Sequence, residues 1–423
     1  MLGVPSAFTL LWGSSVISQL GSFSVATATP LLALAFGASP VVIGWLVAAG
    51  SIPGLLLHLP AGLLVDRIDR WKIMRVSQWI RVVNAVLLAA ALGTFKEPTA
   101  LLIIAALIDG TATVFYNIAE ITVVRHIVPH GDLRNAMATN EARQHIALIL
   151  GRPLGGLLFG LQRIFPYTVG AATSLLSIGT LAWMRKLGSI PDAAATVMPE
   201  ERERPRVALG VALNQVIHDS FLRATIIACA LGNFFFQTII LLLYVTAKDQ
   251  HLSSSSFGLL LAVSGACGLG GAILAPQVLR KVRPRIVVVC CVWAWLIMIT
   301  IVAYSGHVTV ALVAWGLCTF MGVHLNVALA SHQAEHVDSE LQGRVAGICR
   351  FVTGGTVPLG ALGSGYIISG LGLEHAAALA PLPFAAIVAA TLVLLRPLTW
   401  LRRVRLRPVR GRRQAAAAAQ SRP

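Results

Sequence analysis

The segment GLLVDRIDRWK, residues 62–72, places five charged side chains between two long apolar stretches, Val41–Val65 and Met74–Thr94. Each stretch has the roughly 20 residues that a helix needs to cross the hydrocarbon core of a bilayer. The turn between them is short and too charged to lie in hydrocarbon. The arrangement predicts two transmembrane helices joined at the membrane surface.

The composition of the whole chain extends this prediction. Of the 423 residues, 56% are hydrophobic and 12% are charged, whereas a soluble protein carries about 25% charged residues. A soluble enzyme, a secreted domain and a disordered scaffold are therefore excluded. The net charge of +16 would suggest a nucleic-acid partner in a soluble protein. In a membrane protein, basic loops set the orientation, so no nucleic-acid partner is expected.

Apolar stretches of this kind recur along the chain and predict an all-α membrane protein with twelve transmembrane helices. The division is a six-helix bundle over 1–184, a cytoplasmic linker over 185–223, a second six-helix bundle over 224–396 and a basic tail over 397–423. The predicted spans are Phe8–Phe36, Val41–Val65, Met74–Thr94, Thr99–Val124, Ala138–Leu161, Phe165–Met184, Ala224–Thr246, Phe257–Leu279, Ile286–Tyr304, Val308–Ala330, Gly343–Ser369 and Ala376–Leu395.

The basic residues predict the orientation of these spans. Loops on one side of the membrane hold only Lys96, Arg163 and Lys248, and nearly all the other basic residues belong to the opposite side. Because cytoplasmic loops are rich in Lys and Arg, both termini are predicted in the cytoplasm. Residues 1–7 contain no Lys or Arg, so the first span lacks the start of a secretory signal and is expected to be retained.

The two halves of the chain share a pattern. GRPLGG at 151–156 in the fifth span corresponds to VPLGALG at 357–363 in the eleventh. Pro153 and Pro358 are separated by the same number of positions as Gly155 and Gly360. Two six-span repeats joined by a linker are typical of transporters built from parallel repeats.

With this context, the segment 62–72 resembles motif A of the major facilitator superfamily: Gly62, Asp66 four residues later, Arg67, and then Arg70 and Lys72. Asp69 stands where the motif usually has a second glycine. The resemblance implies two six-helix bundles around a central cavity lined by spans one, four, seven and ten. It also implies that the motif is a gate that holds the outward-facing state.

Further segments resemble the drug-exporter branch that includes macrolide efflux proteins and the enterobactin exporter. They are ISQLGS at 17–22, IVPHGDLRNA at 127–136, GRPLGG at 151–156 and LQGRV at 341–345. Ser22 stands where many relatives have Asp, and Arg152 adds a charge among glycines. The resemblance implies a multi-pass protein of the bacterial inner membrane.

Charged residues inside the spans are candidates for function, because each costs roughly 2.5–3.5 kcal/mol at mid-bilayer. Asp109 and Arg152 have similar depths in adjacent spans. Three readings stay open: a structural ion pair, a role in proton coupling or substrate recognition, and side chains that never meet. Glu120 shares a helix face with Asp109 and has Arg125 nearby, which favours a salt bridge at the rim over a proton site. Arg81 either snorkels or reaches motif A.

Polar residues on the expected cavity helices are candidates for substrate contacts, although each is more often bonded to its own backbone. The glycines of the fifth span, together with Gly265, Gly268, Gly270 and Gly271 of the eighth, are expected to allow close packing between the halves. The matching glycines and prolines of the fifth and eleventh spans are expected to pack helices. The cavity candidates are Gln19, Ser22, Asn117, Asn233, Gln237, His324 and Asn326; the packing candidates are Gly151, Pro153, Gly155, Gly156, Pro358 and Gly360.

The leading functional prediction is a secondary active exporter of drug-like or amphiphilic small molecules that works by proton antiport and alternating access. Export of a siderophore or biosynthetic product and lysophospholipid transport are alternatives. A membrane-embedded enzyme is disfavoured, because the chain has no paired carboxylate motif, metal-ligand spacing or nucleotide loop. The expected partners are a small-molecule substrate, protons and membrane lipid. A monomer is expected, with no cofactor and no metal.

Overall fold

The computed structural model describes residues 6–65, 67–94, 99–128, 133–186, 205–250, 254–337 and 339–395. These residues form an all-helical fold, and no strand occurs among them. The helices are α1 (Ser6–Ala35), α2 (Pro40–Val65), α3 (Arg70–Thr94), α4 (Thr99–Ile127), α5 (Leu133–Leu161), α6 (Phe165–Lys186), α7 (Pro205–His218), α8 (Ser220–Asp249), α9 (Ser254–Lys281), α10 (Pro284–Tyr304), α11 (Val308–His336), α12 (Ser339–Leu371), α13 (Leu373–Leu379) and α14 (Pro381–Leu395).

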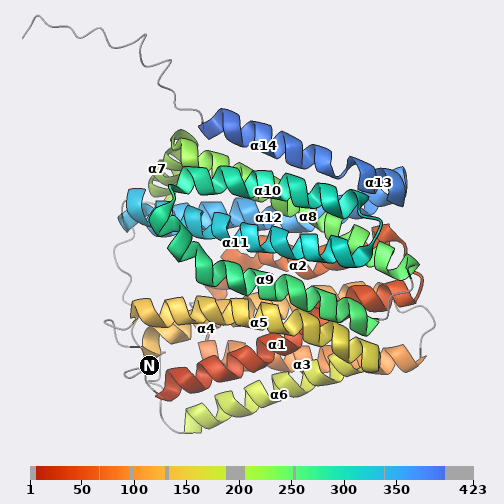
Figure 1. Cartoon of the computed structure of the whole chain (residues 1–423). Helices are drawn as coiled ribbons and strands as arrows, with labels where there is room; N and C mark the ends of the chain where they lie inside the picture. Colours follow the sequence, from red (N-terminus) through yellow and green to blue (C-terminus); the bar gives the residue numbers. More distant parts are fainter. Residues whose placement is uncertain are drawn as a thin grey trace, which may run out of the picture.

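Each predicted span has a counterpart in these helices, with two differences. The last span is divided into α13 and α14 at Ala380, because Pro381 cannot continue the preceding helix and instead begins the next one. The additional helix α7 lies in the predicted linker. Among the described residues, nine helices are long and apolar enough to cross a membrane. The helices α5, α6 and α9 have lengths comparable to those of the nine and lie alongside the other long helices (Figure 1).

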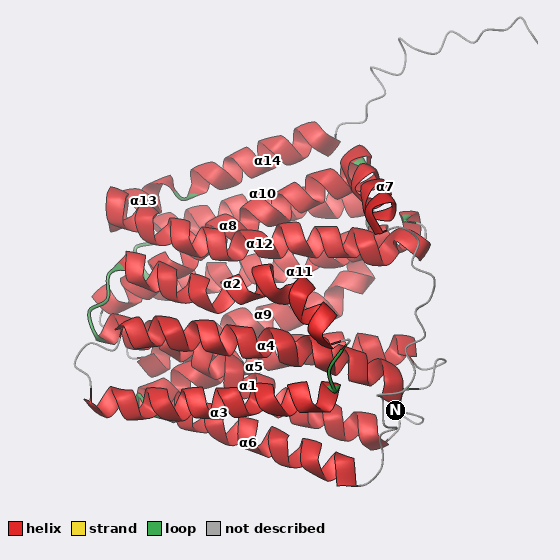
Figure 2. Ribbon diagram, turned by 180° about the vertical axis from the view of Figure 1, so that it is seen from behind, coloured by secondary structure: helices red, strands yellow, loops and turns green. Residues whose placement is uncertain are grey.

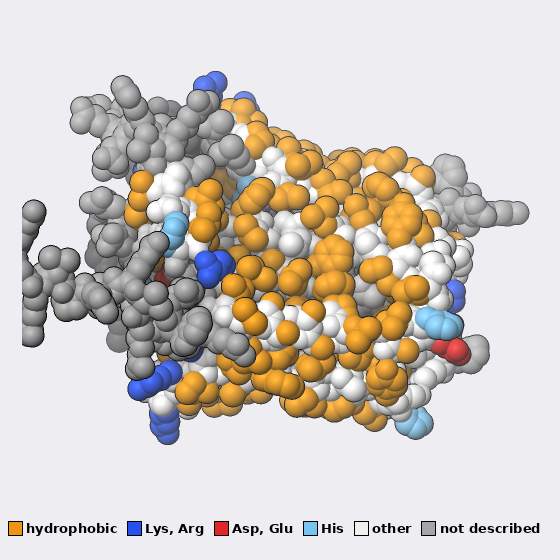
Figure 3. Space-filling model, turned by 90° about the horizontal axis from the view of Figure 1, so that it is seen from above, with side chains coloured by type: hydrophobic (Ala, Val, Ile, Leu, Met, Phe, Trp, Pro, Cys, Tyr) orange, Lys and Arg blue, Asp and Glu red, His pale blue; other side chains and the backbone are white. Residues whose placement is uncertain are grey.

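The long helices lie side by side in two groups (Figures 1 and 2). Helices α1–α6 form one group, in which α2 packs on α4, and α8–α14 form the other, in which α9 packs on α11. Extensive packing of α2 on α12 and of α5 on α9 joins the groups. The face drawn in Figure 3 is largely apolar, and its Lys and Arg side chains lie at the ends of the helices, mostly at one end. Such a belt suits burial in a bilayer.

Small residues bring the two groups together at α2 and α12. A Cβ atom added to Gly44 would lie 2.6 Å from the carbonyl oxygen of Ala361, and one added to Gly365 would lie 2.7 Å from that of Pro40. The backbones therefore approach at distances that exclude a side chain, as small residues permit in membrane helix pairs.

Gly155 of the fifth span and Gly360 of the eleventh contact helices of their own halves. An added Cβ at Gly155 would lie 2.8 Å from Cα of Ser24 in α1, and one at Gly360 would lie 2.7 Å from Cα of Phe234 in α8. Each glycine therefore packs its helix against the first long helix of its own half. The fifth and eighth spans, α5 and α9, do pack on each other across the halves as expected, but the contacts of Gly155 and Gly360 lie within their own halves. The correspondence between the repeats reappears in three dimensions.

In the turn after α2, Asp69 occupies the position of the second glycine of motif A, and its side chain has a structural role there. Asp69 accepts a hydrogen bond from the backbone N–H of Trp71 through Oδ1 at 3.0 Å, so its side chain caps the start of α3. Arg67 and Lys72 are exposed and Arg70 is buried, while Asp66 lies outside the described residues. An added Cβ at Gly62 would meet no atom within 4 Å among the described residues. Among the described residues, therefore, no neighbouring helix approaches Gly62 closely.

The linker helix α7 packs on the second group. Ala212 and Val216 share an apolar cluster with residues of α8, α11 and α12, including Leu222, Leu329 and Val345. Helix α7 ends just before Asp219, whose Oδ1 accepts hydrogen bonds from the N–H groups of Phe221 and Leu222 and so caps the start of α8. The domain division at 184, 223 and 396 stays a prediction.

Candidate functional site

A central cavity of about 560 Å³ lies between the two groups of helices. This volume is within the range of small-molecule sites, roughly 300–1,000 Å³. Its walls come from α1–α6 on one side and from α8, α11 and α12 on the other. Most lining residues are apolar or small. The charged and larger polar ones are His58, Arg81, Asn84, Asp109, Asn117, Arg152, Tyr167, Gln237 and Tyr244.

Asp109 forms an ion pair with Arg81. The Nε atom of Arg81 donates to Oδ1 of Asp109 at 3.0 Å, and the side chains are 6% and 26% exposed, respectively. Packing of α3 against α4 brings the two together. The other donors of Arg81 are also engaged, by Ser22 and by Ser18 at 3.2 Å.

The ion pair bears on the open readings for Asp109 and corrects the expectation for Arg81. Asp109 pairs with Arg81 rather than Arg152, because α4 packs on α3, whereas α5 packs mainly on α1 and α9. Arg81 does not snorkel to the surface or reach motif A; it lies in the interior, where Gln78 also donates to Ser18 at 2.7 Å. The polar face formed by Gln78 and Arg81 on the third span was the available signal, together with serines at helical spacing on the first.

Arg152 lines the same cavity from α5, and its side chain is exposed to it. Among the described residues, no carboxylate lies within 4 Å of its guanidinium group, since every ion pair found there involves other residues. Tyr244 of α8 lines the same cavity, on the side formed by the second group of helices. Within the described part of the chain, the cavity therefore holds one arginine neutralised by a carboxylate and one without an anionic partner.

Glu120 forms a buried ion pair with Arg143 of α5. Both nitrogens at the end of the guanidinium donate to the carboxylate, one of them at 2.7 Å, and the side chains are 1% and 0% exposed. The expected partner, Arg125, has a side chain outside the described part of the chain. Glu120 thus forms a salt bridge, as the sequence favoured, and its described partner is Arg143. The sequence prediction overlooked Arg143 although it is a charged residue inside a predicted span.

The seven cavity candidates separate into two groups. Ser22, Asn117 and Gln237 line the cavity. Gln19, Asn233, His324 and Asn326 are not among the described residues that line it. Gln19 donates to Asn117 at 3.5 Å and Asn233 donates to the carbonyl of Thr353 at 2.9 Å. His324 shares a hydrogen bond with the carbonyl of Phe320 at 2.9 Å, and Asn326 accepts from Cys229 at 3.8 Å. Gln19, Asn233 and Asn326 therefore form hydrogen bonds to other helices, and His324 bonds to a backbone carbonyl of its own helix.

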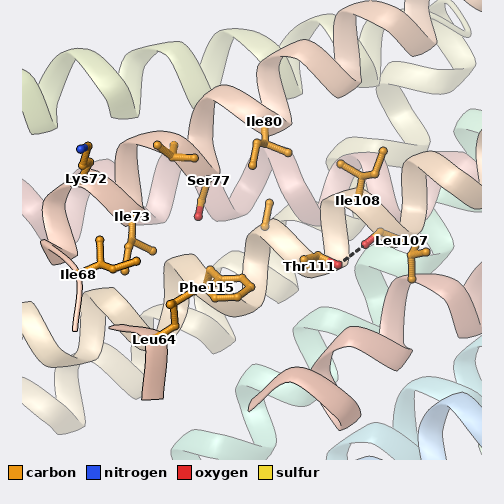
Figure 4. A pocket seen from close by; sticks show the side chains of 12 residues that line it. Leu64, Ile68, Lys72, Ile73, Ser77, Ile80, Leu107, Ile108, Thr111 and Phe115 are labelled. Carbon is orange, nitrogen blue, oxygen red and sulfur yellow. Dashed lines mark hydrogen bonds between the residues drawn. The ribbon is translucent and has the colours of Figure 1, made fainter. Parts of the chain in front are cut away.

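A second hollow, of about 620 Å³, lies on the outer face of α3 and α4 (Figure 4). Its lining is apolar apart from Lys72, Ser77 and Thr111, and Thr111 donates to the carbonyl of Leu107 at 2.8 Å. Val76 is 50% exposed and Leu107 is 44% exposed. The hollow lies on the outside of the bundle, whereas the central cavity holds Arg81, Asp109 and Arg152. The central cavity is therefore the candidate site.

Two groups of apolar helices around a partly polar cavity define a multi-pass membrane transporter. The sequence profile described as Major Facilitator Superfamily matches residues 11–354, and the chain belongs to this family. It is 25% identical over 387 residues to the MFS-type transporter y4rN of Sinorhizobium fredii, covering 86% of this chain and 89% of that protein. It is 22% identical over 309 residues to the MFS-type transporter YkuC of Bacillus subtilis, covering 70% of each chain.

Solved structures with the same fold include a mutant of the nucleoside transporter NupG, with a TM-score of 0.71, 13% identity, and coverage of 92% of this chain and 100% of that chain. A bacterial homologue of the iron transporter ferroportin in an inward-facing state has a TM-score of 0.70 and 12% identity, with 92% and 98% coverage. At these identities the similarity shows the fold.

Proposed function

We propose that this transporter exports amphiphilic small molecules and is driven by protons through Asp109. The observation that carries the proposal is the position of Asp109, the one carboxylate among the described residues that line the central cavity. Its side chain is 26% exposed, so a proton can reach it from the cavity. The mostly apolar lining favours an amphiphilic ligand over a sugar or an inorganic ion.

The ion pair with Arg81 supplies a way to couple the proton to a change in shape. Protonation of Asp109 would remove the negative charge that neutralises Arg81, and the buried guanidinium would then lack a counterion. A conformation in which α3 and α4 rearrange, or in which a ligand group replaces the carboxylate, would then be favoured. This is the two-state behaviour that alternating access requires. Glu120 is a second candidate for coupling, although its carboxylate is buried against Arg143.

The direction of transport is proposed from the resemblance to drug exporters. The test uses everted membrane vesicles with an acid interior, in which exported molecules accumulate. Ethidium and carboxyfluorescein serve as cationic and anionic dyes. We expect accumulation of at least one dye that a protonophore abolishes. The Asp109→Asn variant should lose uphill accumulation but keep downhill exchange.

Glu374→Gln is the matched control, because Glu374 is an exposed carboxylate outside the cavity. It should transport as the unmodified protein does. Full uphill transport by a well-inserted Asp109→Asn variant would place the coupling site elsewhere, and Glu120→Gln would be tested next. Loss of dye from vesicles with an acid interior would contradict export.

A further inference from the structure

Arg152 differs from the other described cavity charges in having no anionic partner. Arg81 is held by Asp109, Ser18 and Ser22, whereas no described carboxylate is within 4 Å of Arg152. Its side chain is exposed to the central cavity, which it lines. An unneutralised charge at mid-membrane depth is costly. Its presence in the cavity is most simply explained by an anion that binds there.

The backbone around Arg152 is fixed. The hydroxyl of Ser24 donates to the carbonyl of Gly151 at 3.0 Å. A Cβ atom added to Gly151 would lie 2.7 Å from Cβ of Phe23, so α5 is seated directly on α1. The α-carbon of Arg152 therefore keeps its place while the long side chain reaches into the cavity. Such support is what a binding residue needs to hold its geometry.

The residues that line the cavity together with Arg152 indicate the chemical character of the rest of the ligand. Tyr244 of α8 lines the cavity from the second group of helices. The second group of helices also contributes Ile240, Leu241 and Trp315 to the lining. A ligand with an anionic group at Arg152 would thus place its apolar part against the other half of the protein. Binding would then link the two halves that alternating access moves.

From this geometry we infer that Arg152 binds a carboxylate or phosphate group of an amphiphilic anion, which is the substrate class of the central cavity. A guanidinium group donates two parallel hydrogen bonds to either group. Asp109 would not compete for this role, because Arg81 already neutralises it. The inference rests on the proposed function for the direction and energy of transport, but not for binding.

The test measures equilibrium dialysis of four naphthalene probes with the purified full-length protein in nanodiscs of neutral phosphatidylcholine. The probes are 2-naphthoate, 2-naphthyl phosphate, 2-naphthylmethylammonium and 2-naphthylmethanol. At least one anion should bind more tightly than the cation and the alcohol. Arg152→Gln should weaken that binding by about 10- to 100-fold, the usual effect of losing a hydrogen-bonded charge. Arg152→Lys should retain part of it, because charge is kept without the two parallel donors. The two anions distinguish a carboxylate site from a phosphate site.

Arg163→Gln is the matched control. Arg163 lies 6.0 Å above the ring of Phe36 and outside the cavity lining, so its replacement should leave anion binding unchanged. The thermal unfolding midpoint verifies that Arg152→Gln is folded; if it is not, Arg152→Lys and added salt, which should weaken anion binding, decide the question. Equal anion binding by the wild type and Arg152→Gln would overturn the inference, as would preference for the cation or no anion binding at all. Anion binding through Arg152 without proton-driven transport would instead overturn the proposed function and leave the site intact.

Discussion

Nε of Arg81 donates a hydrogen bond to Oδ1 of Asp109 at 3.0 Å, which joins α3 to α4 at the wall of the central cavity. The arginine is almost fully buried, and the aspartate is partly exposed to the cavity. An ion pair with one accessible member can be opened from the cavity, whereas a fully buried one cannot. The pair is therefore the element of this fold best suited to respond to a proton or to a ligand.

The first prediction concerns this pair. Asp109→Asn and Arg81→Gln should each destabilise the protein, and the double variant should be more stable than additivity predicts. The expected coupling energy is about 0.5–3 kcal/mol for residues in contact. Thermal unfolding in detergent measures all four proteins of the cycle. The matched cycle of Asp109→Asn with Arg152→Gln should be additive, because those residues form no ion pair. Additivity in the Arg81 cycle would mean that the pair is absent in the protein.

The second prediction concerns Glu120 and Arg143. Glu120→Gln leaves the guanidinium of a fully buried arginine without its counterion, at a cost of about 3–5 kcal/mol in unfolding free energy. Adding Arg143→Met removes the charge and should recover part of this stability. Unfolding of the three proteins in detergent provides the comparison. A double variant less stable than Glu120→Gln alone would contradict the prediction.

The third prediction uses two helical glycines. A Cβ at Gly155 would lie 2.8 Å from Cα of Ser24 and 2.9 Å from its backbone carbonyl carbon, so Gly155→Ala must push α5 away from α1. A loss of about 1–3 kcal/mol is expected. At Gly179 of α6 an added Cβ would meet no described atom within 4 Å, so Gly179→Ala should be neutral or stabilising by up to about 1 kcal/mol. The ranking of the two unfolding midpoints tests the packing, and equal midpoints would refute it.

The fourth prediction concerns Asp219 at the start of α8. Burial alone would raise the pKa of this carboxyl. A hydrogen bond with His332 at 2.8 Å, hydrogen bonds from the N–H groups of Leu222 and Phe221, and the electrostatic attraction to His332 outweigh burial and lower the pKa to about 2. Because the folded pKa is depressed, the charged form stabilises the fold above the ordinary pKa of 3.8, and this stability is lost as the pH falls towards 2. With the carboxyl 26% exposed, we expect about 1 kcal/mol.

The measurement is the difference in unfolding free energy between the wild type and Asp219→Asn at several pH values. Asn retains the helix cap but cannot be charged. The difference should be constant above about pH 5 and should shrink towards zero near pH 2. The His332→Gln variant, which removes one partner, should move this transition to higher pH. A difference that does not depend on pH would show that Asp219 is not stabilised as an anion.

The fifth prediction is the orientation in the membrane. A reporter fused after Pro423 should be labelled only from the cytoplasm, because basic residues concentrate on that side of the predicted loops. The same reporter inserted at Gly306, in the turn between α10 and α11, should be labelled only from the outside. The opposite pattern would reverse the proposed direction of transport.

The positions of the long helices could be predicted from the sequence because the cost of exposing backbone or charge to hydrocarbon acts on each span separately. The stretches 41–65 and 74–94 recur as α2 and α3, and the single late break at Ala380 coincides with a proline. The relation between Gly155 and Gly360 was also readable, since a repeat preserves sequence spacing together with its packing role.

The partners of the charged side chains were decided by the tertiary structure. The depth of Asp109 along its span is compatible with a partner at Arg152 and with a partner at Arg81. The helical rise fixes the depth of a residue in the membrane, but it does not fix the direction in which the side chain points. The packing of α3 on α4 and of α5 on α1 sets the direction in which each helix faces. As a result, Asp109 pairs with Arg81 and Glu120 pairs with Arg143. The sequence alone therefore predicted a membrane transporter built of long apolar helices, and only helix packing decided which charges neutralise each other and left Arg152 facing the cavity.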